Sequence, residues 1–108
     1  MQAAILLCRD LQRGDASAVD LMKQTYRRID EVNPEVNALV SLIPEADAIL
    51  LAEAADAVPI AERGPLHGLP MAPKDMVEVA GFATTWGFVP WANNIAQTDD
   101  ALAARMRA

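Results

Sequence analysis

The clearest amphipathic pattern of the chain follows Ser17. Its hydroxyl can accept a hydrogen bond from the backbone N–H of Asp20, and an acidic first turn suits the positive end of a helix. The pattern predicts a helix over Ser17–Asn33, which ends at Asn33–Pro34 because the residue before a proline disfavours helical angles. Apolar side chains then recur at the three- and four-residue spacing of one buried helix face: Val19, Met22, Tyr26 and Ile29.

A second helix is predicted before the first, over Gln2–Gln12. It is rich in apolar residues and is followed by Gly14, at the position of a left-handed helix cap. The apolar stripe is wide for a surface helix, so we expect it to bury against a partner surface. Cys8 belongs to this stripe and is interpreted as a packed small hydrophobe rather than a nucleophile.

Two further helices are predicted later in the chain. Pro44–Val58 starts with a proline and is rich in Ala, Leu and Glu, and Pro59 follows it. Near the end, Thr98 would cap a last helix that has Leu102 and Met106 on its inner face. In the third helix the expected buried face consists of Ala46, Ile49, Leu50 and Ala54.

Strands are predicted where apolar residues lack a helical period. Val36–Ile43 is rich in Val, Leu and Ile, and Leu69–Ala72 is a shorter apolar run. The second run lies inside Gly64–Gly87, which holds four of the five glycines. Glycine can adopt backbone angles that other residues avoid, and proline fixes φ. A stretch that is rich in both is typical of a backbone that positions a functional group.

Composition restricts the class of protein. A chain of 108 residues with 53% apolar residues can form one domain with a core and is not disordered. It has no apolar run near the roughly 20 residues of a membrane span. The net charge of −6 disfavours nucleic acid or an anionic membrane as partner. A single cysteine, Cys8, and a start without signal-peptide character indicate the cytoplasm.

Lys74 is the candidate for chemistry. It lies between the apolar runs Leu69–Ala72 and Met76–Ala80, directly before Asp75. A lysine in apolar surroundings loses hydration of its charged form, so its pKa falls and it can act as a base. The alternative is a lysine at a strand end that reaches water and pairs with Asp75 or Glu78.

The stretch GPLHGLPMAPKDMVEVAGFATTWG closely resembles a segment of the amidase signature family. In that family a Gly-Pro-Leu-x-Gly-apolar-Pro run leads to a Lys-Asp pair, an apolar stretch, Ala-Gly and Thr-Thr-x-Gly. The resemblance extends over essentially the whole chain. It implies a mixed sheet wrapped by helices and hydrolysis or transfer of carboxamide nitrogen by a Ser–cis-Ser–Lys triad, with Lys74 as the triad lysine. Pro73 and Phe88 depart from the pattern, and the Gly/Ser-rich stretch with both triad serines is absent.

Other nucleophiles and sites have weaker support. Ser17 is assigned to capping and Ser41 to a strand, whereas Thr84–Thr85 lie near the lysine in sequence but are not N-terminal, as threonine nucleophiles usually are. A Cys8–His67 dyad would rest on one residue of each type. A lone His67 does not provide the three or four ligands of a zinc site, and the glycines around it do not form a phosphate loop.

The sequence as a whole therefore predicts that residues 1–108 form one truncated N-terminal portion of an α/β amidase-signature domain, with helices on a small mixed sheet. The function predicted is that of a cytoplasmic amidase without metal or cofactor, acting on a small-molecule amide with Lys74 as the catalytic residue. The chain alone is expected to be inactive, because two triad members and the oxyanion hole are missing. Exposed strand edges and apolar patches predict a homo-oligomer. The alternative is a non-catalytic helical binding module derived from an amidase.

Overall fold

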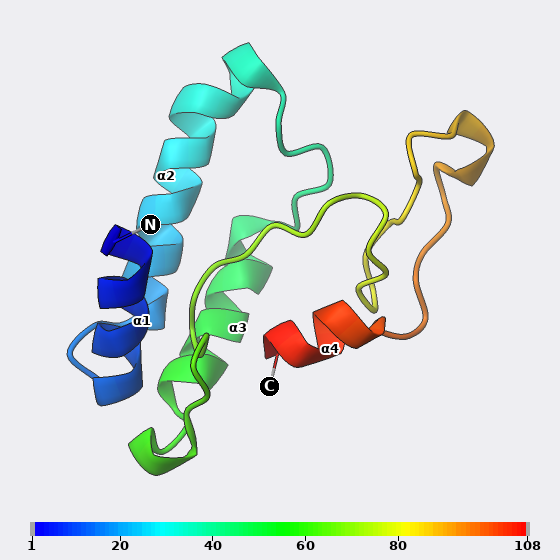
Figure 1. The fold of residues 1–108 in the computed structure, drawn as a ribbon. Helices are drawn as coiled ribbons and strands as arrows, with labels where there is room; N and C mark the ends of the chain where they lie inside the picture. Colours follow the sequence, from blue (N-terminus) through cyan, green and yellow to red (C-terminus); the bar gives the residue numbers. More distant parts are fainter. Residues whose placement is uncertain (1, 108) are drawn as a thin grey trace. The chain divides into compact units, whose positions relative to one another are not determined.

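The computed structural model describes residues 2–107. The chain divides into two compact units, an N-terminal unit Met1–Pro70 and a C-terminal unit Met71–Ala108. The N-terminal unit contains the helices α1 (Gln2–Arg13), α2 (Ala18–Val36) and α3 (Glu45–Asp56), and a short 3₁₀ helix η1 (Ile60–Glu62). The C-terminal unit contains the 3₁₀ helix η2 (Val89–Trp91) and the helix α4 (Ala101–Arg107), as labelled in Figure 1.

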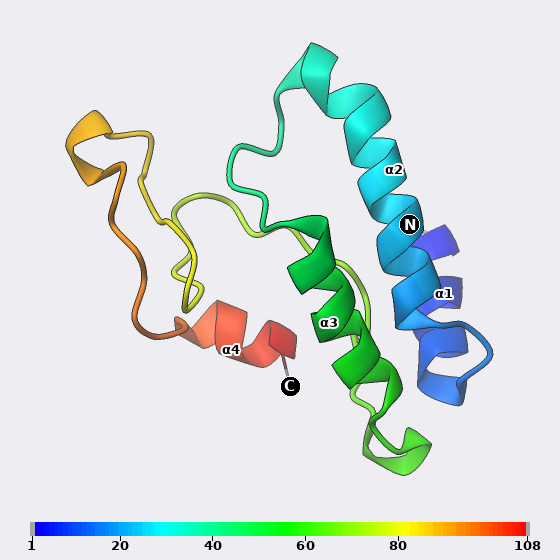
Figure 2. The ribbon, with the colours of Figure 1, turned by 180° about the vertical axis from the view of Figure 1, so that it is seen from behind.

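The N-terminal unit is a bundle of three helices. α1 and α2 form a helical hairpin, and α3 lies antiparallel beside α2 in both views (Figures 1 and 2). Gly14 ends α1 with a φ of +76°, as its position predicted, and its N–H donates to the carbonyl of Leu11. The Ser17 hydroxyl accepts the N–H of Asp20 at 3.2 Å, so the predicted N-cap of α2 is confirmed.

The core of this unit is small and built from close contacts. Leu11, Ala18 and Ala52, one from each helix, are its buried centre. Gly68 packs against this buried centre, since a Cβ built at Gly68 would lie 3.0 Å from the Cβ of Ala18. Its φ of +72° is also one that residues with a Cβ rarely adopt. Partly buried apolar side chains surround this centre: Ala16, Val19, Leu21, Met22, Ala55 and Leu69.

The ends of the three helices are joined by two charged side chains, which we call the Asp56–Arg63 junction. The Asp56 carboxylate accepts the Ser17 hydroxyl at 2.7 Å and the N–H groups of Ala18 and Val19 at 2.8 and 3.2 Å. Burial opposes ionisation of Asp56, but these hydrogen bonds, from Ala18, Ser17 and Val19, and the nearby Arg63 lower its pKa overall. The Asp56 carboxylate thus caps the N-terminus of α2.

The Arg63 guanidinium of the same junction donates to three carbonyls. These are Leu11 in α1 at 2.7 Å, Asp56 in α3 at 2.9 Å and Val58 at 3.0 Å. The last carbonyls of a helix have no partner inside it, and a cation there also complements the helix dipole. Arg63 therefore ties the C-terminal ends of α1 and α3 together.

The predicted end of α2 at Asn33–Pro34 is wrong, because Pro34 lies inside the helix. A proline removes one N–H, and so close to the C-terminus this costs a single hydrogen bond. The helix runs on to Val36 and ends at Asn37, which has a φ of 46° and donates to the Asn33 carbonyl at 2.7 Å. The Asn33 side chain then binds both the N–H and the carbonyl of Leu39.

The predicted α/β class, with helices on a small mixed sheet, is contradicted. No β-strand forms within residues 2–107; an isolated antiparallel bridge joins Ala83 and Ile95. Val36–Ile43, predicted as a strand, begins in α2 and continues as irregular chain, and Leu69–Ala72 is irregular as well. Strand propensity reflects packing against neighbouring strands, and the described residues supply none. In the segment between α2 and α3, side chains form hydrogen bonds with the backbone instead. The Tyr26 hydroxyl, for example, donates to the Ile43 carbonyl at 2.8 Å.

The C-terminal unit is held by backbone hydrogen bonds between residues 81–84 and 94–96. The N–H of Gly81 donates to the Ala96 carbonyl at 2.9 Å, and the N–H of Ala96 donates to the Phe82 carbonyl at 3.0 Å. Asp100, rather than the predicted Thr98, caps α4, since its carboxylate accepts the N–H of Leu102 and of Ala103. No helix among residues 2–107 combines the length and the apolar character that crossing a membrane requires.

Candidate active site around Lys74

Lys74 lies in an irregular stretch of the C-terminal unit, and its side chain is exposed. Its carbonyl accepts the N–H of Met76 at 2.7 Å and of Val77 at 2.9 Å, so the chain turns sharply directly after it. Among residues 2–107 we find no hydrogen bond or ion pair of the Lys74 ammonium. The pairing with Asp75 or Glu78 that the sequence left open does not form there.

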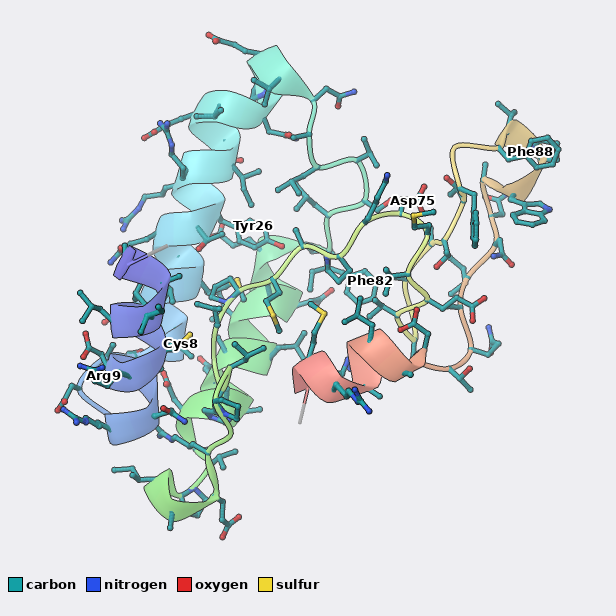
Figure 3. All side chains as sticks on the ribbon, viewed as in Figure 1. Cys8, Arg9, Tyr26, Asp75, Phe82 and Phe88 are labelled. Carbon is teal, nitrogen blue, oxygen red and sulfur yellow. The ribbon has the colours of Figure 1, made fainter. Side chains whose placement is uncertain are left out.

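The Asp75 carboxylate instead binds Thr85, in the second half of the motif. Its Oδ1 accepts the N–H of Thr85 at 2.7 Å, its Oδ2 accepts the Thr85 hydroxyl, and its carbonyl accepts the N–H of Trp86 at 3.1 Å. Figure 3 labels Asp75 within this irregular stretch. The hydrogen bond from the Thr85 hydroxyl, followed by that from the Thr85 N–H, lowers the pKa of Asp75. We call this set of contacts the Asp75–Thr85 clasp.

A tight turn follows the clasp. The N–H of Phe88 donates to the Thr85 carbonyl at 2.9 Å, while Trp86 and Gly87 between them have φ values of 56° and 68°. Positive φ at both central positions defines a type I′ turn, which glycine adopts easily and tryptophan does not. The Gly87 N–H also donates to the Thr85 hydroxyl oxygen at 3.2 Å. The Thr-Thr-x-Gly sequence is therefore a turn anchored on Asp75.

The aromatic side chains of this turn are largely exposed. Trp86 is 58%, Phe88 54% and Trp91 48% exposed. Phe88, labelled in Figure 3, packs edge-to-face on Trp91 with 5.7 Å between ring centres. About half of the surface of each aromatic side chain is therefore available for an interface or a ligand.

The two threonines differ sharply in surroundings. The Thr85 hydroxyl donates to Asp75 and accepts from Gly87, so both of its roles are taken. Thr84 is 1% exposed, and its hydroxyl has no partner among the described residues. A nucleophile needs a base within hydrogen-bonding reach, and a carboxylate with a lowered pKa, as at Asp75, is a poor base. The geometry therefore does not favour either threonine as a nucleophile.

The remaining candidates all belong to the N-terminal unit. The Ser17 hydroxyl is engaged by Asp56 and Asp20, and Ser41 is exposed in the bend between α2 and α3. His67 donates its Nε2–H to the Ala55 carbonyl at 2.8 Å, which fixes the Gly64–Gly68 turn to α3. Cys8, labelled in Figure 3, is half-buried in a groove with apolar neighbours such as Ile5, and no Cys8–His67 hydrogen bond is found in residues 2–107.

The contact between Asp75 and Thr85 was not predicted from the sequence. The two residues are ten positions apart in irregular chain, where no periodicity indicates a contact. The available signal was the type of residue: aspartate and threonine side chains are frequent anchors of turns, and Gly81 lies between these two.

Comparison with known proteins places the chain in a family. The family model described as Amidase matches residues 20–108, which include Lys74, Asp75 and Thr85. The chain therefore belongs to the amidase family. An acylamidase of Rhodococcus erythropolis is 32% identical over 106 residues, which are 97% of this chain and 22% of the relative. The A subunit of a glutamyl-tRNA(Gln) amidotransferase from Methylobacillus flagellatus is 36% identical over 99 residues, 91% of this chain and 20% of the relative. The chain thus spans about a fifth of the length of these relatives.

Proposed function

We propose that the chain forms part of an amidase that hydrolyses the C–N bond of a carboxamide, with Lys74 as its catalytic base. Membership of the amidase family supports the class of reaction. The observation that carries the assignment of Lys74 is the exposed ammonium, which has no partner in residues 2–107, next to a backbone anchored by the Asp75–Thr85 clasp. A base must be able to meet its proton donor, and a lysine already held in an ion pair could not.

The proposed mechanism is that of a Ser–cis-Ser–Lys triad. Neutral Lys74 accepts a proton from the cis-serine, which in turn accepts the proton of the nucleophilic serine as its oxygen attacks the amide carbon. The tetrahedral oxyanion collapses, the amine leaves with a proton returned through the same relay, and water hydrolyses the acyl-serine. Both serines would lie in a Gly/Ser-rich stretch outside these 108 residues, whose own serines are Ser17 and Ser41.

The proposed substrate is a small-molecule amide, and no metal or cofactor is part of the proposal. The net charge of −6 disfavours a polyanionic substrate or an anionic membrane surface. A single cysteine suits a cytoplasmic location, which we include in the proposal.

The test uses the product of the complete reading frame that encodes this chain, assayed against aliphatic and aromatic amides. Lys74→Ala should lower kcat/KM by about 10⁴-fold or more, because the nucleophile then has no base. Lys74→Arg should fail as well, since a guanidinium stays protonated. Lys23→Ala, at the other lysine of the chain, on the exposed side of α2, is the matched control and should remain active. Near-normal turnover by folded Lys74→Ala would overturn the assignment.

These 108 residues alone are expected to hydrolyse no amide at a useful rate, since they contain one triad member and no Gly/Ser turn for an oxyanion. Turnover by the purified chain that disappears in Lys74→Ala would show that the nucleophile lies within it. In that case Thr84 and Thr85 would be the residues to replace next, whatever the geometry of their hydroxyls.

The second candidate function is a non-catalytic helical module that binds a partner or a second copy. It is favoured by large apolar side chains of the N-terminal unit that are between 49% and 62% exposed: Ile5, Leu6, Leu50 and Leu51. With either function we expect the isolated chain to self-associate. A monomeric mass by light scattering at high micromolar concentration would contradict this expectation.

A further inference from the structure

We propose that Asp75 is the positioning residue of Lys74: its clasp with Thr85 fixes the backbone that carries the lysine and keeps the carboxylate away from the ammonium. The catalytic consequence rests on the proposed function, whereas the clasp itself can be tested without any activity. Asp75 touches neither substrate nor reacting atoms in this proposal and acts through Lys74.

The backbone around Asp75 determines where the Lys74 amine can reach. A lysine side chain is long and flexible, so the reach of its amine depends on how firmly the main chain at its base is held. No helix or strand holds residues 69–79. The Asp75 carboxylate takes two hydrogen bonds from Thr85, and the Asp75 carbonyl takes a third from Trp86. These contacts attach the residue next to Lys74 to a type I′ turn that is itself closed by a hydrogen bond.

The charge of Asp75 also affects Lys74. An aspartate beside a lysine in sequence is an obvious ion-pair partner, and such a pair would stabilise the protonated amine. Here Thr85 occupies both carboxylate oxygens of Asp75, one through its N–H and one through its hydroxyl. The Gly87 N–H approaches the same hydroxyl from the other side. The carboxylate is thereby satisfied without Lys74, and the lysine stays available for proton transfer.

The variants that test the proposal differ by single groups. Thr85→Val deletes the hydroxyl of the clasp but keeps the shape and the N–H bond to Asp75, whereas Thr85→Ser restores the hydroxyl. Thr84→Val is the matched control, since it makes the same change one residue earlier, at a buried hydroxyl without a partner among residues 2–107. In the product of the complete reading frame, Thr85→Val should lower kcat by about 10- to 100-fold with KM changed less than threefold. Thr85→Ser should regain most of kcat, and Thr84→Val should stay within about twofold.

A merely structural role would give a different pattern. If Thr85→Val and Thr84→Val lowered kcat equally, or if Thr85→Ser did not restore it, the positioning role would be overturned. A change confined to KM would overturn it too, because a misplaced base lowers the chemical step.

The clasp is tested separately by amide hydrogen exchange of the 108-residue chain. Exchange of the Thr85 N–H should accelerate at least about tenfold in Asp75→Ala, relative to the N–H of Thr84, which is bound by the Asn94 carbonyl at 2.9 Å. Equal acceleration of both would mean that the clasp does not exist as described. If the clasp is present but Lys74→Ala retains activity, the proposed function fails and the clasp stands. If Lys74→Ala is inactive but Thr85→Val is normal, the positioning inference fails alone.

Discussion

Replacement of Arg63 by methionine should destabilise the N-terminal unit by about 3 kcal/mol. The guanidinium donates three hydrogen bonds, to the carbonyls of Leu11, Asp56 and Val58 at 2.7 to 3.0 Å. A charged hydrogen bond is worth about 1.5–3 kcal/mol where water is excluded. Arg63 is only half-buried, so water can reach the carbonyls that are left, and we use about 1 kcal/mol for each bond. Arg63→Lys retains one donor position of three and should recover about 1 kcal/mol.

The measurement is urea unfolding followed by two probes at once. Far-ultraviolet circular dichroism reports mainly α1, α2 and α3, whereas the tryptophans, Trp86 and Trp91, both belong to the C-terminal unit. With a slope of about 1 kcal/mol per molar urea, the midpoint of the dichroism transition should fall by roughly 3 M in Arg63→Met. If the wild-type midpoint is below roughly 3 M urea, the helices of Arg63→Met should already be unfolded without urea.

Arg27→Met is the matched control for this experiment. Arg27 is an exposed arginine of α2 with no ion pair or hydrogen bond among residues 2–107. The same loss of charge and the same new side chain should there change the midpoint by less than about 0.5 M. Equal shifts in Arg63→Met and Arg27→Met would contradict this prediction, since the three carbonyl contacts would then contribute nothing.

Three further outcomes are expected. The pKa of Asp56 is lowered in the folded state, so its stabilising effect is present above the ordinary pKa of 3.8 and is lost as the pH falls through the folded pKa. The urea midpoints of wild type and Asp56→Asn should therefore converge in acid. A difference between the two midpoints that stays constant with pH would contradict this. Trp86→Asn should stabilise the C-terminal unit by about 1 kcal/mol, because asparagine accepts the φ of 56° that strains tryptophan, and a lower fluorescence midpoint would exclude the assigned turn. Gly68→Ala should lower the free energy of unfolding by about 2 kcal/mol or more, because it adds a clash with Ala18 to the backbone strain. Gly87→Ala has a similar φ but nothing within 4 Å of its Cβ, so it should lower the free energy of unfolding by only about 1 kcal/mol. Equal losses would show that the clash at Gly68 relaxes.

Local signals predicted the helices well. Ser17 and Asp20 identified the start of α2 because capping involves residues three apart in the chain. The apolar face of that helix was also right: Val19, Met22, Tyr26 and Ile29 are all partly buried. Both inferences depend on short-range geometry, which a single sequence contains in full.

The buried face of α3 was predicted wrongly. Ala48 and Ala52 are buried, whereas Leu50, expected inside, is 62% exposed. Acidic residues interrupt the apolar ones on both sides of this helix, so periodicity does not select a face. Contact with α2 selects it instead, and small side chains such as Ala52 let the two helices approach closely.

Long-range contacts account for the rest of what the sequence did not reveal. The triad role predicted for Lys74 rested on the resemblance of its motif to a family, and the clasp that Asp75 makes with Thr85 bridges ten residues of irregular chain. The strand expected at Val36–Ile43 depended on neighbouring strands, which apolar residues alone do not supply. In each case the missing information lies in which segments meet.

The Asp56–Arg63 junction joins residues that are made far apart in time during synthesis of the chain on the ribosome. The Leu11 carbonyl finds its partner only 52 residues later, when Arg63 has been added. At about 5–20 residues per second this delay lasts roughly 3–10 s. α1 has 12 residues, about the length at which an isolated helix is marginal in water. Until Arg63 is available, the Leu11 carbonyl lacks this hydrogen bond, so slow codons just before position 63 would prolong the time that α1 spends without it.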